Sequence, residues 1–137
     1  MKVLIDTSAF MALILENESY HQKVVDQYKA YKKSRAQLIT SDYILDELYT
    51  RCVYRAGSFG AKLAVDLIQE IVDHNELTVL EIDSQVFQKA QGIFLKFSDN
   101  KISFTDTTSY VLYKNFALDE IFTLDSDFKK LKVSTSF

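Results

Sequence analysis

Acidic residues stand at points of the sequence where a strand would stop or a helix would begin. Asp6 and Asp125 each follow a short apolar run, Asp106 lies at the start of an expected helix, and Glu47 lies within another. In open α/β sheets the active crevice lies at the carboxyl ends of the strands, so these acids are candidates for one common site. Carboxylates that share a cleft repel one another and stay ionised only with a cation between them. Oxygen ligands of this kind suit Mg²⁺ or Mn²⁺ rather than zinc, so the pattern predicts a divalent metal site.

Each acid also has an ordinary structural interpretation when it is taken alone. Asp6 could cap a helix that begins at the Thr-Ser pair after it, and Asp106 could complement a helix dipole. The stretch 125–127 (Asp-Ser-Asp) could be a simple turn. Helical periodicity does not choose between Asp46 and Glu47, because both fall outside the apolar arc of their helix, on opposite flanks. The spacing alone therefore leaves both interpretations open for every acid.

A scaffold of alternating strands and helices is needed to bring these acids together. Short apolar runs predict strands at 3–5, 38–39, 77–82 and 121–124, and the tail 128–137 could add an edge strand. Helical spacing and capping residues predict helices at 9–15, 20–33, 42–57, 61–72, 84–97 and 105–115. Strands separated by helices imply crossover connections. We therefore expect a single α/β domain over residues 1–137, with a central parallel sheet of about four or five strands and helices on both faces.

The composition excludes several other classes of protein. A chain of 137 residues with 47% hydrophobic and 26% charged residues has the size and balance of one folded domain. One cysteine and two histidines are too few for a disulfide or a Cys/His zinc site, and three glycines cannot build a glycine-rich phosphate loop. The sequence has no signal peptide or membrane-spanning run. These features predict a cytoplasmic protein with no membrane partner.

The formal net charge of -3 argues against binding nucleic acid by bulk positive charge. If the four candidate acids were neutralised by bound cations, however, the rest of the chain would carry a slight positive charge. The acidity is therefore compatible with a metal site in a protein that binds a polyanion.

The residues carry a family resemblance over essentially the whole chain. The segments LIDTSAF near the start, ILDEL in the middle and SFTDTTSYVLYKNFALDEIFTLDSDFKKL near the end occur in the order and spacing of a PIN domain. This resemblance implies a Mg²⁺- or Mn²⁺-dependent nuclease that acts on RNA, and small stand-alone members are commonly the toxin of a VapC-type toxin–antitoxin pair. It matches Asp6, Glu47, Asp106 and Asp125 to the four family acids in that order.

Further roles follow from the same resemblance. Asp127 is similar to an auxiliary acid of some members, and Ser8 and Thr123 match small polar positions beside the site. Asp6, Asp106 and Asp125 are then expected to be the main metal ligands, with Glu47 binding through water or positioning the nucleophile. The early helices are expected to form homodimer or antitoxin surfaces. Arg51 and Arg55, one helical turn apart and close to Glu47 in sequence, are candidate contacts for RNA or for the acidic arm of an antitoxin.

Two alternatives stay open at this point. The chain could be an RNA-processing PIN nuclease without an antitoxin. It could also be a receiver-like regulatory module, which uses acids at strand ends around Mg²⁺, although Asp6 is followed by Thr-Ser rather than by a second acid.

Overall fold

Four short parallel strands form the sheet of the computed structural model, which describes residues 1–137. They are β1 (Lys2–Ile5), β2 (Gln37–Ser41), β3 (Leu77–Leu80) and β4 (Glu120–Phe122), in the spatial order β3-β2-β1-β4. Leu4 of β1 pairs with Ile39 on one side and with Ile121 on the other. The predicted parallel sheet with helical crossovers is confirmed. The order places the first and last strands next to each other, although they are far apart in sequence.

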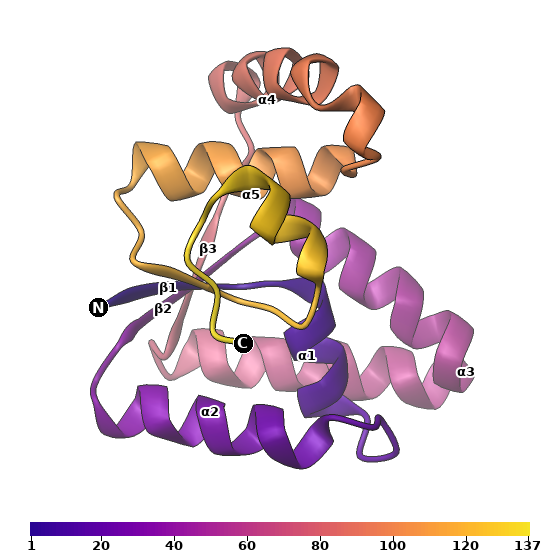
Figure 1. The fold of residues 1–137 in the computed structure, drawn as a ribbon. Coiled ribbons are helices and arrows are strands. Elements are labelled where there is room, and N and C mark those ends of the chain that lie inside the picture. The colour runs from indigo at the N-terminus through magenta and orange to yellow at the C-terminus, as the bar shows by residue number, and fades with distance from the viewer.

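Helices cover both faces of this sheet, as Figure 1 shows. The helices α1 (Thr7–Ile14) and α2 (His21–Lys33) and the second half of α3 (Asp42–Asp73) lie on one side of it, and α5 (Phe104–Asn115) lies on the other, with α4 (Ser84–Lys96) packed outside α5. Two short 3₁₀ helices, η1 (Ser98–Asn100) and η2 (Ser126–Leu131), flank α5 and β4 in the sequence. No helix combines the length and the apolar character that crossing a bilayer would require.

The helix α3 is bent where the sequence predicts a break between two helices. Gly57 has a φ of 59° and a ψ of -147°, a backbone conformation that is essentially restricted to glycine. Three residues later, a Cβ on Gly60 would lie 2.4 Å from the carbonyl oxygen of Cys52. The first glycine permits the turn, and the second permits the close approach of the two halves of the helix.

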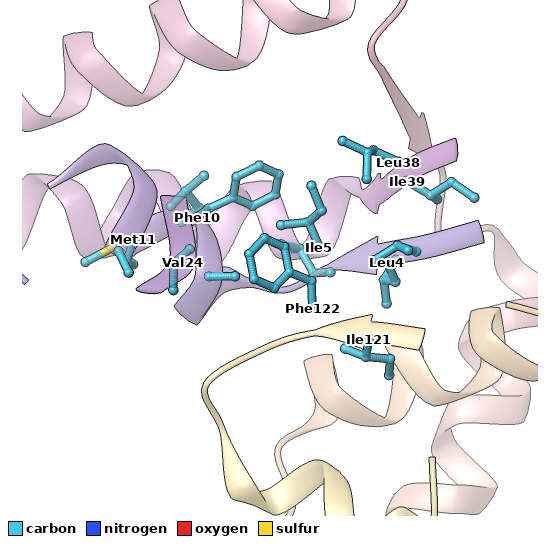
Figure 2. Packing of buried hydrophobic residues seen from close by; sticks show 14 of the residues in the cluster. Leu4, Ile5, Phe10, Met11, Val24, Leu38, Ile39, Ile121 and Phe122 are labelled. Carbon is cyan, nitrogen blue, oxygen red and sulfur yellow. The ribbon is translucent and has the colours of Figure 1, made fainter. Parts of the chain in front are cut away.

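The main hydrophobic core lies between the sheet and the helices α1, α2 and α3. Figure 2 shows β1 residues Leu4 and Ile5 packed among side chains from β2, β4, α1 and α2. The largest side chains without exposed surface are Phe10, Phe122 and Phe128. A smaller cluster that includes Val86 of α4 and Leu112 of α5 holds those two helices together. Burying side chains of this size contributes roughly 1.5–3 kcal/mol each, so the strand ends that carry the acids are firmly anchored.

The expectation of an edge strand in the tail is wrong for most of its length. Residues 126–131 form η2 instead, and only Thr135 makes an isolated parallel bridge, to Ile121. Phe128 and Leu131 are both buried and stand three residues apart, which places them on the same side of a 3₁₀ helix. The Asp125 side chain caps η2 by accepting a hydrogen bond from the Asp127 N–H, so the chain turns away from the sheet directly after β4.

Candidate metal centre

Asp6 lies immediately after β1 and has two structural roles, one in the pairing of strands and one at the start of a helix. Its N–H donates to the carbonyl oxygen of Phe122 (3.0 Å), which continues the pairing of β1 with β4. Its backbone is extended, and its side chain accepts from the N–H of Ser8, so it is also the N-cap of α1. The capping interpretation is therefore correct for Asp6, and it does not compete with the site, because the cap holds the carboxylate at the carboxyl end of the sheet.

Two hydroxyl groups fix the orientation of the Asp6 carboxylate. The Thr123 hydroxyl donates to Asp6 Oδ2 at 2.9 Å, and the Ser8 hydroxyl lies 3.1 Å from the same oxygen. Each hydroxyl oxygen also accepts a backbone N–H from the segment after β4: Ser8 accepts from Leu124 and Thr123 accepts from Asp125, both at 2.9 Å. Ser8 and Thr123 thus tie the first turn of α1 to the loop that carries Asp125.

Asp125 and Asp127 occupy the turn between β4 and η2. Asp125 Oδ1 accepts from the Asp127 N–H at 2.9 Å, so the turn interpretation of this stretch is also correct locally. Asp127 Oδ1 lies 2.7 Å from the Lys130 ammonium. One carboxylate oxygen from each of Asp125, Asp127 and Asp106 lies within 4.8 Å of the others, which is close enough for one cation to contact all three.

Asp106 reaches the same place from the first turn of α5. The Ser103 hydroxyl accepts from the Asp106 N–H at 3.1 Å and begins the helix there. The Asp106 side chain is only 7% exposed. Burial, which is the largest cause, and the charges of Asp6, Asp125 and Glu47 together raise the pKa of Asp106 to about 8. Burial also raises the pKa of Asp6, against the opposing effect of its hydrogen bonds from Thr123 and Ser8, and Glu47 adds to the rise.

Glu47 comes from α3, and the tertiary structure distinguishes it from Asp46. Ser41 begins α3 by accepting from the Ile44 N–H at 3.1 Å. From this start, Glu47 faces the other acids and is half-buried, whereas Asp46 is exposed and lies outside the pocket. Arg51 lies one helical turn later, and its Nη2 is 3.4 Å from Glu47 Oε1.

All of the sequence-predicted acids line one pocket of about 180 Å³ that has no hydrophobic residue in its wall. The lining residues are Asp6, Ser8, Glu47, Arg51, Lys101, Ser103, Asp106, Asp125 and Asp127. Thr123 lies behind Asp6, and Arg55 lies in a neighbouring pocket, where it pairs with Glu18.

Two lining residues, Lys101 and Ser103, are absent from the sequence-based candidates. A serine three residues before an acid is a capping pattern, so Ser103 has a signal in the sequence. Lys101 has none: it is in the left-handed conformation, with a φ of 57°, and it reaches the pocket because η1 ends there.

The donor set fits a divalent cation that prefers oxygen. No salt bridge reaches Asp6, Asp106 or Asp125, so no cationic side chain of the protein pairs directly with these three carboxylates. The acidic groups of the wall are all carboxylates, and the wall contains neither a thiol nor an imidazole. This is the ligand chemistry of Mg²⁺ or Mn²⁺.

Comparison with known protein families matches residues 3–133 to the PIN domain. The chain belongs to the PIN domain family. This membership agrees with the sequence resemblance and with the four-stranded parallel sheet, and it removes the receiver-like alternative. No curated protein sequence matches the chain.

Solved structures of the same fold include several VapC proteins. VapC20 of Mycobacterium tuberculosis, a toxin that cleaves the sarcin–ricin loop, superposes with a TM-score of 0.80 at 20% identity, over 96% of this chain and 95% of that chain. VapBC2 of Rickettsia felis, bound to a promoter DNA fragment, superposes with a TM-score of 0.74 at 11% identity, over 99% of this chain and 98% of that chain. VapBC-1 of nontypeable Haemophilus influenzae superposes with a TM-score of 0.70 at 14% identity, over 99% of this chain and 97% of that chain. At these identities the likeness establishes the fold.

Proposed function

We propose that this PIN domain is a divalent-metal-dependent endoribonuclease and the toxin of a type II toxin–antitoxin pair. The observation that carries the proposal is the convergence of Asp6, Glu47, Asp106 and Asp125 in one pocket without apolar walls. These acids come from four separate elements of the chain. Since burying mutually repelling carboxylates is costly without a cation, the arrangement favours a metal-dependent reaction over a purely structural role.

The proposed mechanism assigns a separate task to each part of the pocket. A divalent ion held by these acids would supply an activated water and would neutralise charge on a phosphodiester. Asp106, Asp125 and Asp127 would hold the ion from the α5 and β4–η2 side, and Asp6 from the end of β1. Thr123 and Ser8 keep the Asp6 carboxylate oriented before substrate arrives. Glu47 stands on α3, where it can accept a hydrogen bond from the attacking water and position it.

Cationic side chains at the rim suit a phosphodiester substrate. Arg51 and Lys101 line the acidic pocket itself, and Arg51 also lines the adjacent pocket that contains Arg55. We propose that Arg51 and Arg55 contact RNA phosphates or an antitoxin. Phosphate contacts of this kind supply affinity without sequence preference.

An antitoxin partner is supported by the surface around the bend of α3. Tyr54 is 85% exposed and Phe59 is 70% exposed, so this surface offers two large aromatic rings for a partner to bury. The VapBC complexes among the structures of the same fold are consistent with a protein partner. A homodimer, a cytoplasmic location and one nuclease domain over 1–137 are further parts of this proposal.

The decisive experiment is cleavage of RNA by the purified protein with Mg²⁺ or Mn²⁺. We expect cleavage that EDTA abolishes. The Asp106→Asn variant should lose more than about 100-fold in rate, because even the outer partners of a metal site cost 10–100-fold. Asp46→Asn is the matched control and should keep the wild-type rate, since Asp46 lies outside the pocket. Full activity of Asp106→Asn, or equal loss in Asp46→Asn, would contradict the proposal.

The toxin assignment has its own test. Expression of the chain should arrest bacterial growth, and co-expression with the protein encoded by the adjacent reading frame should restore it. If the adjacent product neither binds the chain nor restores growth, an RNA-processing nuclease without an antitoxin becomes the better assignment.

A further inference from the structure

A second pocket of about 180 Å³ lies beside the metal centre, between the start of α2 and η2. Asp125 lines both pockets, so the two meet at that carboxylate. The walls differ in chemistry. The second pocket is lined by two lysines, Lys23 and Lys129, and by two aromatic residues, Tyr20 and Phe137. The acids on one side of Asp125 would hold a cation, and the other side presents lysine side chains and aromatic rings.

Both lysines of this pocket are available to bind an anion. Neither Lys23 nor Lys129 takes part in a salt bridge, whereas the neighbouring Lys130 is paired with Asp127. The Lys23 ammonium lies 4.2 Å from the centre of the Phe137 ring. Phe137 in turn packs edge-on against the buried Phe122, with the ring centres 6.0 Å apart. The Lys23 ammonium is thus supported by an aromatic ring that packs against the core, and no carboxylate forms a salt bridge with it.

Tyr20 supplies an open aromatic face next to these charges. It is 56% exposed and lies directly before α2, with its ring centre 5.8 Å from the Lys23 ammonium. Its position is held by the next residue, since His21 Nδ1 lies 2.6 Å from the carbonyl oxygen of Ala12 in α1. An exposed ring beside two unpaired lysines matches the two parts of a nucleotide, because bases stack on aromatic rings and phosphates bind ammonium groups.

We propose that this pocket binds the nucleotide next to the scissile phosphate, with its base on Tyr20 and its phosphate between Lys23 and Lys129. The inference rests on the proposed ribonuclease function and makes it more specific. A base inside a duplex is already stacked on both faces, so it can reach Tyr20 only when it is unpaired. The pocket therefore requires an unpaired base beside the scissile phosphate.

The first test measures binding without cleavage. Asp106→Asn protein in Mg²⁺ is titrated into a short fluorescent single-stranded RNA at several salt concentrations. Each phosphate contact to a single strand contributes about 0.7 to the slope of log affinity against log salt. Lys23→Gln and Lys129→Gln together should reduce the magnitude of that slope by about 1.4. Each substitution alone should reduce it by about half as much.

Lys114→Gln is the matched control for the lysine variants. Lys114 also lies over two tyrosine rings, at 5.6 and 5.8 Å, and also lacks a salt bridge, but it stands at the far end of α5 from Asp106. It should leave both affinity and slope unchanged. Wild-type affinity and slope in the double lysine variant would overturn the inference, and so would an equal effect of Lys114→Gln.

The second test separates stacking from charge. Tyr20→Leu should weaken single-stranded RNA binding roughly tenfold, as expected for the loss of one stacked base, and should not change binding of a duplex of the same sequence. Equal affinity of the parent protein for both RNAs, with no effect of Tyr20→Leu, would overturn the inference. Thermal unfolding checks that each variant keeps its fold, which we expect because the three substituted side chains are exposed.

A cleavage assay distinguishes failure of this inference from failure of the proposed function. Bis(p-nitrophenyl) phosphate is a small phosphodiester that can enter the acidic pocket without occupying the second one. If the wild type cleaves it and RNA, and the lysine variants keep the same ratio of the two rates, only the inference fails. If the wild type cleaves neither with Mg²⁺ or Mn²⁺, the proposed function fails.

Discussion

Asp106→Asn should stabilise the metal-free protein at pH 8, although the substitution disables the proposed site. Burial and the neighbouring acids raise the pKa of Asp106 from 3.8 to about 8. The unfolded chain therefore releases this proton near pH 4, and the folded chain retains it until about pH 8. Because the unfolded state binds fewer protons across this window, the stability contributed by Asp106 falls as the pH rises and reaches its lowest value above pH 8.

The magnitude follows from the same pKa. Each tenfold change in proton affinity is worth about 1.4 kcal/mol, so ionising Asp106 in the folded protein costs on the order of 5 kcal/mol. This figure is an upper value, because four acids share the repulsion. The position of Asp106 in the first turn of α5 favours its negative charge by only about 0.3–1 kcal/mol. Burial and repulsion therefore outweigh the helix dipole.

The assay is urea unfolding of the wild type and Asp106→Asn in EDTA between pH 4 and pH 8. We expect the variant to be more stable than the wild type by about 2–5 kcal/mol at pH 8, and the difference to disappear towards pH 4. Saturating Mg²⁺ should stabilise the wild type, by about 2.7 kcal/mol at 100 times its Kd, and should stabilise the variant less.

Asp46→Asn is the control for this measurement, since an exposed acid outside the pocket should change stability by no more than about 0.5 kcal/mol at any pH. A difference between wild type and Asp106→Asn that does not vary with pH would refute the reasoning. So would a variant that is less stable than the wild type at pH 8 in EDTA.

Three further predictions concern Glu47, the hydrogen bond between Thr123 and Asp6, and the two glycines Gly60 and Gly92. Glu47→Gln should lower kcat for RNA cleavage while the stabilisation by Mn²⁺ in thermal unfolding is largely retained; complete loss of that stabilisation would instead make Glu47 a direct ligand. Thr123→Val removes the 2.9 Å hydrogen bond to Asp6 Oδ2 and should lower kcat about 10–100-fold with little change in KM, and an unaltered kcat would contradict this positioning role. Gly60→Ala should destabilise the fold by about 1–3 kcal/mol, because a Cβ would lie 2.4 Å from the Cys52 carbonyl oxygen. Gly92→Ala should instead stabilise α4 by roughly 0.5–1 kcal/mol, because a Cβ there would meet nothing within 4 Å. If chemical denaturation gave both changes in stability the same sign, this packing argument would be contradicted.

Much of the fold could be predicted from local patterns. The apolar runs located the four strands, and Gly57 marked the bend of α3. The tail could not be predicted in this way, because its residues form η2 through the Asp125 cap and through burial of Phe128 against the rest of the fold. Caps and short apolar pairs fit several local structures, and long-range packing selects among them.

The site shows the same division between local and long-range information. The sequence by itself predicted the chemistry, since carboxylates occur after β1 and β4 and in the first turn of α5, and carboxylates are ligands for an oxygen-preferring cation. Helical periodicity could not decide between Asp46 and Glu47, and only the family resemblance selected Glu47. No pattern in the sequence indicated Lys101, which reaches the pocket through the fold. The sequence also presented capping and metal binding as alternatives for Asp6, whereas the structure combines them.

Only the tertiary structure decided that the acids form a single site. The hydrogen bond between Thr123 and Asp6 joins residues 117 positions apart, and it exists because β4 pairs with β1. Periodicity records which side chains prefer to be buried, and that preference is local. Strand order depends on how all the buried surfaces fit together at once, so it brings β1 beside β4 and converts separate helix caps and turns into one acidic pocket.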